Sequence, residues 1–100
     1  MMNGKKNYKK MKTKIKELPS WFNGELYDEG DIVRNPFTNV SVELNAEELS
    51  MYDFIKGAEW VINQDFSANT EGTRKVMKEF DKGLRWFRSS NSKAYMVLLD

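Results

Sequence analysis

The chain has 100 residues, the usual length of one domain, and its 40% hydrophobic residues, with 13% aromatics, suffice for one modest core. It contains neither cysteine nor histidine, which excludes disulfides, thiolate or imidazole metal sites, and catalysis by a Ser-His or Cys-His pair. The net charge is only +1, and no stretch approaches the roughly 20 apolar residues of a membrane span. We therefore expect a cytoplasmic protein that is not an enzyme, binds no cofactor and does not enter a membrane.

The small net charge hides a segregation of charges along the chain. Residues 1–16 contain seven lysines and no acidic residue, whereas residues 17–66 contain eleven acidic and two basic residues. Residues 67–100 contain seven basic and four acidic residues. Mutually repelling lysines with few apolar neighbours do not sustain a helix. We predict a flexible lysine-rich tail at residues 1–17, followed by one domain at residues 18–100.

The first part of this domain predicts an aromatic cap and a β-hairpin. Trp21 and Phe22 precede an Asn-Gly turn signal and are expected to cover one end of the core. Strand-like alternation of apolar and polar residues follows within Asp31–Leu44. The turn between the two strands is assigned to Asn35–Asn39, because asparagine tolerates the left-handed conformation that a turn exit often needs.

Two amphipathic helices are predicted next. Asn45 and Glu48 form a capping-box pattern at the start of a helix that runs from Ala46 to about Asn63. Its buried face is expected to hold Met51, Phe54, Ile55, Ala58, Val61 and Ile62. Thr70 is expected to cap a second helix, over about residues 71–89. The apolar face of this helix consists of Val76, Met77, Phe80, Gly83, Leu84 and Phe87.

The chain ends in a continuous apolar run, Ala94–Leu99. Such a run is typical of a strand that is covered on both faces, so we expect it to dock beside the hairpin. The predicted fold class is α+β, in the order β-β-α-α-β. A small sheet, made of the β-hairpin and the C-terminal strand, packs against two helices.

Large apolar residues outside the predicted centre of the core are the first candidates for function. Trp60 lies opposite the apolar face of its helix, so it either packs beneath Trp21, Phe22 or the N-terminal tail, or marks a binding patch, where tryptophan is enriched. Trp86 lies at the margin of the basic face of the second helix, so it too is either buried or available for binding. The candidate contacts with a protein partner are Trp60, Leu49, Trp86 and, in the hairpin turn, Phe37.

Basic residues suggest a nucleic-acid partner as the alternative. Lysines placed near phosphates release counterions, and one face of the second helix is rich in basic side chains. The competing interpretations are a solvated tail, a tail that folds back on the acidic middle of the chain, and an ordinary solvated helix face. The candidate contacts are Lys5, Lys6, Lys9, Lys10, Arg74, Lys78, Lys82 and Arg85.

Acidic residues do not form a recognisable metal or catalytic motif. Asp28, Glu29 and Asp31 lie in one turn but lack the alternating oxygen ligands of an EF-hand loop. Nothing in the sequence directs two carboxylates into a common cleft, as paired-carboxylate hydrolysis requires. We expect no metal site and no catalytic residue.

Five short segments carry a resemblance to a family: Asn35–Thr38, Val42–Glu47, Tyr52–Gly57, Trp86–Phe87 and Ala94–Asp100. In this order they resemble small proteins encoded by tailed phages of marine cyanobacteria and other marine bacteria. The resemblance covers Val33 to Asp100 and assigns no catalytic or binding residue. It implies an accessory protein that acts in the host bacterial cytosol or in a virion. We expect such a protein to bind a host or phage protein or, as the alternative, a nucleic acid.

Overall fold

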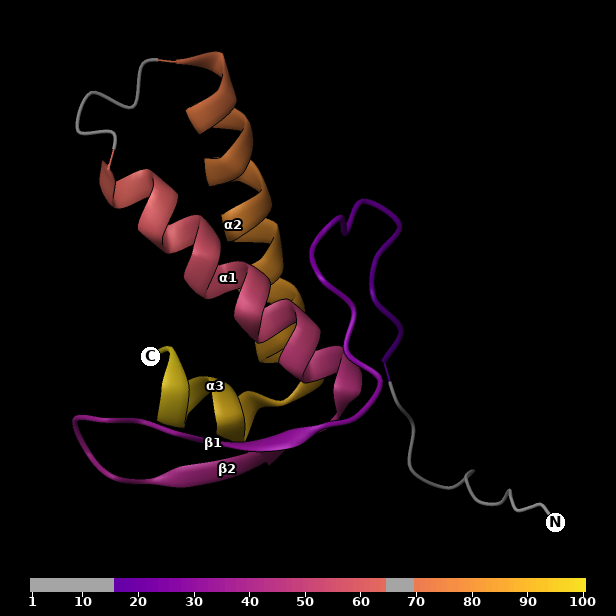
Figure 1. The fold of residues 1–100 in the computed structure, drawn as a ribbon, viewed down its shortest axis with the longest axis vertical. Coiled ribbons are helices and arrows are strands. Elements are labelled where there is room, and N and C mark those ends of the chain that lie inside the picture. The colour runs from indigo at the N-terminus through magenta and orange to yellow at the C-terminus, as the bar shows by residue number, and fades with distance from the viewer. Residues whose placement is uncertain (1–15, 65–69) are drawn as a thin grey trace, which may run out of the picture.

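The computed structural model of the chain describes residues 16–64 and 70–100. Lys5, Lys6, Lys9 and Lys10 therefore lie outside the described residues. The described part has an α+β fold, with the elements β1 (Asp31–Arg34), β2 (Ser41–Leu44), α1 (Ala46–Gln64), α2 (Glu71–Ser90) and α3 (Ser92–Leu98). Helices α1 and α2 form a long helical hairpin, and the two strands and α3 lie at its base (Figure 1).

The predicted β-hairpin is confirmed. Strands β1 and β2 pair antiparallel, with Val33 opposite Val42. The backbone N–H of Asn35 donates to the carbonyl of Val40 (2.9 Å), which closes the turn, and Asn39 has the expected left-handed conformation (φ 64°). Gly30 precedes β1 because a Cβ atom there would collide with the backbone carbonyl oxygen of Leu44. The strand pairing therefore depends on a residue without a side chain at position 30.

Both predicted helix starts are also confirmed. The Asn45 side chain accepts a hydrogen bond from the Glu48 N–H (2.8 Å), and the Glu48 carboxylate accepts one from the Asn45 N–H (3.0 Å). This reciprocal pair satisfies two backbone donors that a helix start otherwise leaves unpaired. The Thr70 hydroxyl accepts from the Thr73 N–H (3.1 Å) and begins α2.

The predicted C-terminal strand is wrong, because the segment forms helix α3. The Asn91 side chain accepts a hydrogen bond from the Ala94 N–H (3.0 Å) and caps this helix. The backbone N–H groups of Tyr95 and Leu99 then find their acceptors four residues earlier, so the segment needs no strand partner. The apolar run suits one buried helix face: Ala94 is buried, whereas Met96 is 67% exposed.

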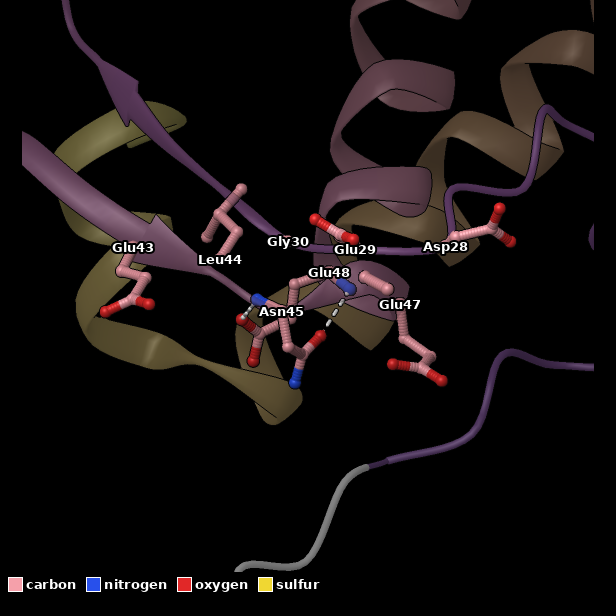
Figure 2. A pocket seen from close by; sticks show the side chains of 9 residues that line it. Asp28, Glu29, Gly30, Glu43, Leu44, Asn45, Glu47 and Glu48 are labelled. Atoms are coloured by element: carbon pink, nitrogen blue, oxygen red, sulfur yellow. Dashed lines mark hydrogen bonds between the residues drawn. The ribbon is translucent and has the colours of Figure 1, made fainter.

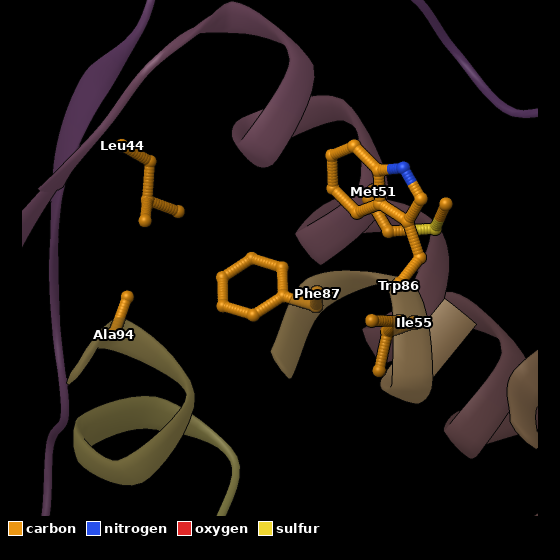
Figure 3. Packing of buried hydrophobic residues seen from close by; sticks show 6 residues of the cluster. All are labelled: Leu44, Met51, Ile55, Trp86, Phe87 and Ala94. Carbon is orange, nitrogen blue, oxygen red and sulfur yellow. The ribbon is translucent and has the colours of Figure 1, made fainter. Parts of the chain in front are cut away.

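The core lies where the helical hairpin meets the sheet and α3. The Phe87 ring of α2 occupies its middle, with Leu44 and Ala94 on one side and Met51, Ile55 and Trp86 on the other (Figure 3). Trp86 donates its indole N–H to the backbone carbonyl of Glu17 (3.0 Å). This bond ties the beginning of the described chain to α2.

Candidate functional site

An exposed apolar surface lies on the far half of the helical hairpin, away from the sheet. Trp60 on α1 is 64% exposed, and its neighbour Val61 is 39% exposed although the sequence pattern placed it on the buried face. Met77 on α2 is 40% exposed. Of the two interpretations of Trp60, the structure supports the exposed one.

A groove opens beside this surface, between α1, α2 and the segment that leads to β1. It encloses about 370 Å³. We call it the hairpin groove; it is lined by Gly24, Glu25, Asp53, Phe54, Gly57, Ala58, Val61, Val76 and Glu79. Its apolar residues come from one stripe of α1, at the spacing of successive helical turns, and from the facing side of α2.

Phe54 of the groove lining packs against the two aromatic residues that the sequence placed over one end of the core. The rings of Trp21 and Phe22 lie 5.8 Å and 5.6 Å from the ring of Phe54, measured between centroids. A Cβ atom on Gly24 would lie 2.8 Å from the Phe22 ring and 3.2 Å from Phe54, so the segment that carries this cap lies close to α1. Among the described residues, nothing lies within 4 Å of the position of a Cβ atom on Gly57. The helix surface above Gly57 is therefore open.

Three of the residues that line the groove carry carboxylates, and its lining contains no lysine or arginine. Glu79 pairs with Lys75 (3.7 Å), which stands outside the lining. Burial raises the pKa of the Tyr27 hydroxyl above its ordinary value of 10.0, and the nearby carboxylates of Asp53 and Glu25 and a hydrogen bond with Asp53 raise it further. The lining of the groove thus combines apolar residues with three acidic side chains.

The other predicted protein contacts are not part of this surface. Trp86 is only 8% exposed and belongs to the core, and Leu49 is half-buried against the core. Phe37 is 92% exposed, but the loop between β1 and β2 lies far from the end of α1 that carries Trp60 (Figure 1). The structure therefore separates Phe37 from Trp60.

The four basic residues predicted on the second helix are exposed along α2. Arg85 pairs with Asp81, and the Lys82 ammonium lies 5.9 Å from the centre of the Trp21 ring. Near the start of α2, a shallow hollow of about 490 Å³ is lined by Glu71, Gly72, Arg74, Lys75 and Lys78. Of the predicted set, Arg74 and Lys78 thus share one basic hollow.

A wider hollow of about 700 Å³ lies where β2 meets α1. Its acidic side chains are Asp28, Glu29, Glu43, Glu47 and Glu48 (Figure 2). Glu48 is 7% exposed and engaged in the helix cap. Across residues 16–64 and 70–100, no three acidic side chains are arranged to hold a metal ion.

Comparisons with known proteins give no match to any family model, any curated protein or any solved structure. None of the helices in the described part of the chain combines the length and the apolarity that crossing a membrane requires.

The hairpin groove was missed in the sequence because Phe54, Ala58 and Val61 fit the buried face of an amphipathic helix. One signal indicated it. Near the end of α1, apolar residues lie on two faces of the helix, at Trp60 and at Val61, and the single apolar face of α2 cannot cover both. Gly57, in the middle of a helix, was a second signal, since glycine there costs stability unless close approach requires it.

Proposed function

We propose that the chain is a small non-enzymatic interaction module, and that it binds a host or phage protein through the hairpin groove and Trp60. The observation that carries this proposal is the juxtaposition of a 64% exposed tryptophan with an open apolar groove on the same helix. Tryptophan is enriched among residues that dominate binding energy, and interface cores are apolar. The resemblance to phage accessory proteins supports a role in the cytosol of an infected bacterium.

A nucleic-acid-binding accessory protein is the second candidate. The basic hollow formed by Arg74, Lys75 and Lys78 favours it, because clustered basic side chains contact phosphates. The salt bridge of Lys75 with Glu79 and that of Arg85 with Asp81 oppose it, because they offset charge on the same helix. Protein binding is therefore the better-supported function.

Site-specific photo-crosslinking tests the first candidate. A benzophenone amino acid replaces Trp60 in the full chain, and the adducts formed in cells that carry the gene are identified by mass spectrometry. Met96 provides a matched control position, because it is apolar and 67% exposed but lies on α3. We expect one discrete protein adduct from position 60 that position 96 does not give. The same adducts from both positions would refute the assignment of this surface.

Fluorescence anisotropy with short DNA and RNA tests the second candidate. Arg74→Glu combined with Lys78→Glu removes two bases of the hollow and leaves the hairpin groove unchanged. Affinity that falls steeply with salt and is lost in this variant would favour nucleic-acid binding. No binding at low salt would eliminate it.

A further inference from the structure

In the described part of the chain, only one end of the apolar stripe on α1 is covered by other residues. Trp21 and Phe22 cover Phe54, but the stripe continues along α1 through Ala58 and Val61 beyond the end of this covering. From Asp53 to Val61, α1 advances about 12 Å, which is slightly more than two helical turns. A further helix packed on α1 and α2 would extend the layer that Trp21 and Phe22 begin.

Gly57 fits such a helical occupant. It lies midway along the stripe, with open space where a Cβ atom would stand. Packed helices lie about 8–10 Å apart, and the distance depends on the size of the side chains at the contact. A glycine at this point lets a second helix approach α1 closely.

The charges of the groove select the polar residues of that helix. Glu25, Asp53 and Glu79 line the groove together with its apolar residues, and the only salt bridge of these three in the described part of the chain joins Glu79 to Lys75. Complementary charges around an apolar contact fix the choice and the orientation of a partner. An acidic helix would place like charges against these carboxylates.

We infer that the hairpin groove takes a basic amphipathic helix of the partner protein, with apolar residues at helical spacing and flanking lysine or arginine. This inference rests on the proposed function and specifies its ligand. The apolar face of the helix covers Phe54, Ala58 and Val61, its backbone passes over Gly57, and its basic residues face Glu25 and Asp53. This is helix-in-groove recognition, in which anchors at i, i+3, i+4 and i+7 supply the contacts.

Two synthetic helical peptides of about 18 residues, long enough to span the groove, test this inference by NMR titration of the full chain. Both carry the same leucine face; one has lysine and the other glutamate at every polar position. We expect the lysine peptide to shift the amide signals of Gly57, Val61 and Val76 and the indole signal of Trp60. The glutamate peptide is expected to leave these signals unchanged.

Two variants with equal net charge show whether the effect is local. Glu25→Lys changes the lining of the groove, whereas Glu43→Lys changes an exposed residue of β2 outside it. We expect Glu25→Lys to weaken binding of the lysine peptide about three- to fivefold, as loss of one partly exposed ion pair does, and Glu43→Lys to weaken it less than twofold.

The outcomes separate this inference from the proposed function. If both peptides shift the signals of the groove residues equally, the requirement for a basic helix is overturned, and the groove remains a docking site. No groove shift with either peptide would overturn both. Two further outcomes would overturn the inference: shifts centred on Glu43 and Glu47, or equal weakening of lysine-peptide binding by Glu25→Lys and Glu43→Lys. Either would show that the lysine peptide binds through a general attraction between opposite charges.

Discussion

The side-chain amide of Asn91 donates a hydrogen bond to the carboxylate of Glu48 (3.3 Å), across 43 positions of sequence. Each of the two residues also caps a helix: Glu48 belongs to the capping box of α1, and Asn91 begins α3. One contact therefore joins the start of α1 to the junction of α2 and α3.

Asn91→Ala removes both the cap of α3 and the donor to Glu48. A lost N-cap costs about 1 kcal/mol, and a buried carboxylate deprived of a partner adds about 1 kcal/mol or more. We expect the free energy of unfolding in urea to fall by about 2 kcal/mol. The exposed Asn63 near the end of α1 provides the control, Asn63→Ala, which should change stability by less than about 0.5 kcal/mol. Equal stability of the two variants would contradict the linking role of Asn91.

Tyr27 predicts a pH dependence of stability at the alkaline end. Burial, followed by the carboxylates of Asp53 and Glu25, raises the pKa of Tyr27 above 10.0 in the folded chain. The stabilising contribution is therefore fully present below the unfolded pKa and is lost as the pH rises through the higher folded pKa. Thermal melts should show that stability decreases more steeply above about pH 10 in the wild type than in Tyr27→Phe. Parallel curves would show that Tyr27 titrates as an exposed tyrosine does.

Two helical glycines are predicted to respond oppositely to alanine. A Cβ atom on Gly57 meets nothing within 4 Å, whereas one on Gly83 lies 3.2 Å from both Ile55 and Met51. Gly57→Ala should raise the free energy of unfolding by about 0.5–1 kcal/mol, because alanine favours helix. Gly83→Ala should gain nothing or lose stability, because the packed side chains of Ile55 and Met51 must shift to admit the Cβ atom. The two measurements in urea are independent of any partner, and a loss of stability in Gly57→Ala would show that its surface is already covered.

Local signals in the sequence predicted most of the fold. The capping box at Asn45 and Glu48, the cap at Thr70 and the turn at Asn39 act over four residues or fewer, so their chemistry is visible in the chain itself. The C-terminal segment was predicted wrongly because a run of apolar residues fits a covered strand and a half-buried helix equally well. The cap at Asn91 favours the helix. Asn91 can act as this cap only because α2 ends immediately before it.

The candidate site was less predictable than the fold. The sequence places Trp60 opposite the apolar face of its helix and leaves both burial and exposure open, because the outcome depends on how far Trp21 and Phe22 cover α1. Trp86 occupies a similar margin on α2 and is buried because Glu17 supplies an acceptor for its indole N–H. Such long-range contacts decide which of two similar tryptophans reaches the surface.

Gly57→Leu tests most directly whether the hairpin groove is the docking surface. Leucine is a better helix former than glycine, and its Cβ atom meets open space at this position, so the fold is expected to be at least as stable as that of the wild type. The added side chain fills the path of an approaching helix. The measurement is the yield of the protein adduct from the photo-crosslinker at position 60, with and without Gly57→Leu, together with a melting curve. The account predicts that the adduct is lost while the melting temperature is kept or raised. An undiminished adduct in a fully folded Gly57→Leu chain would contradict it.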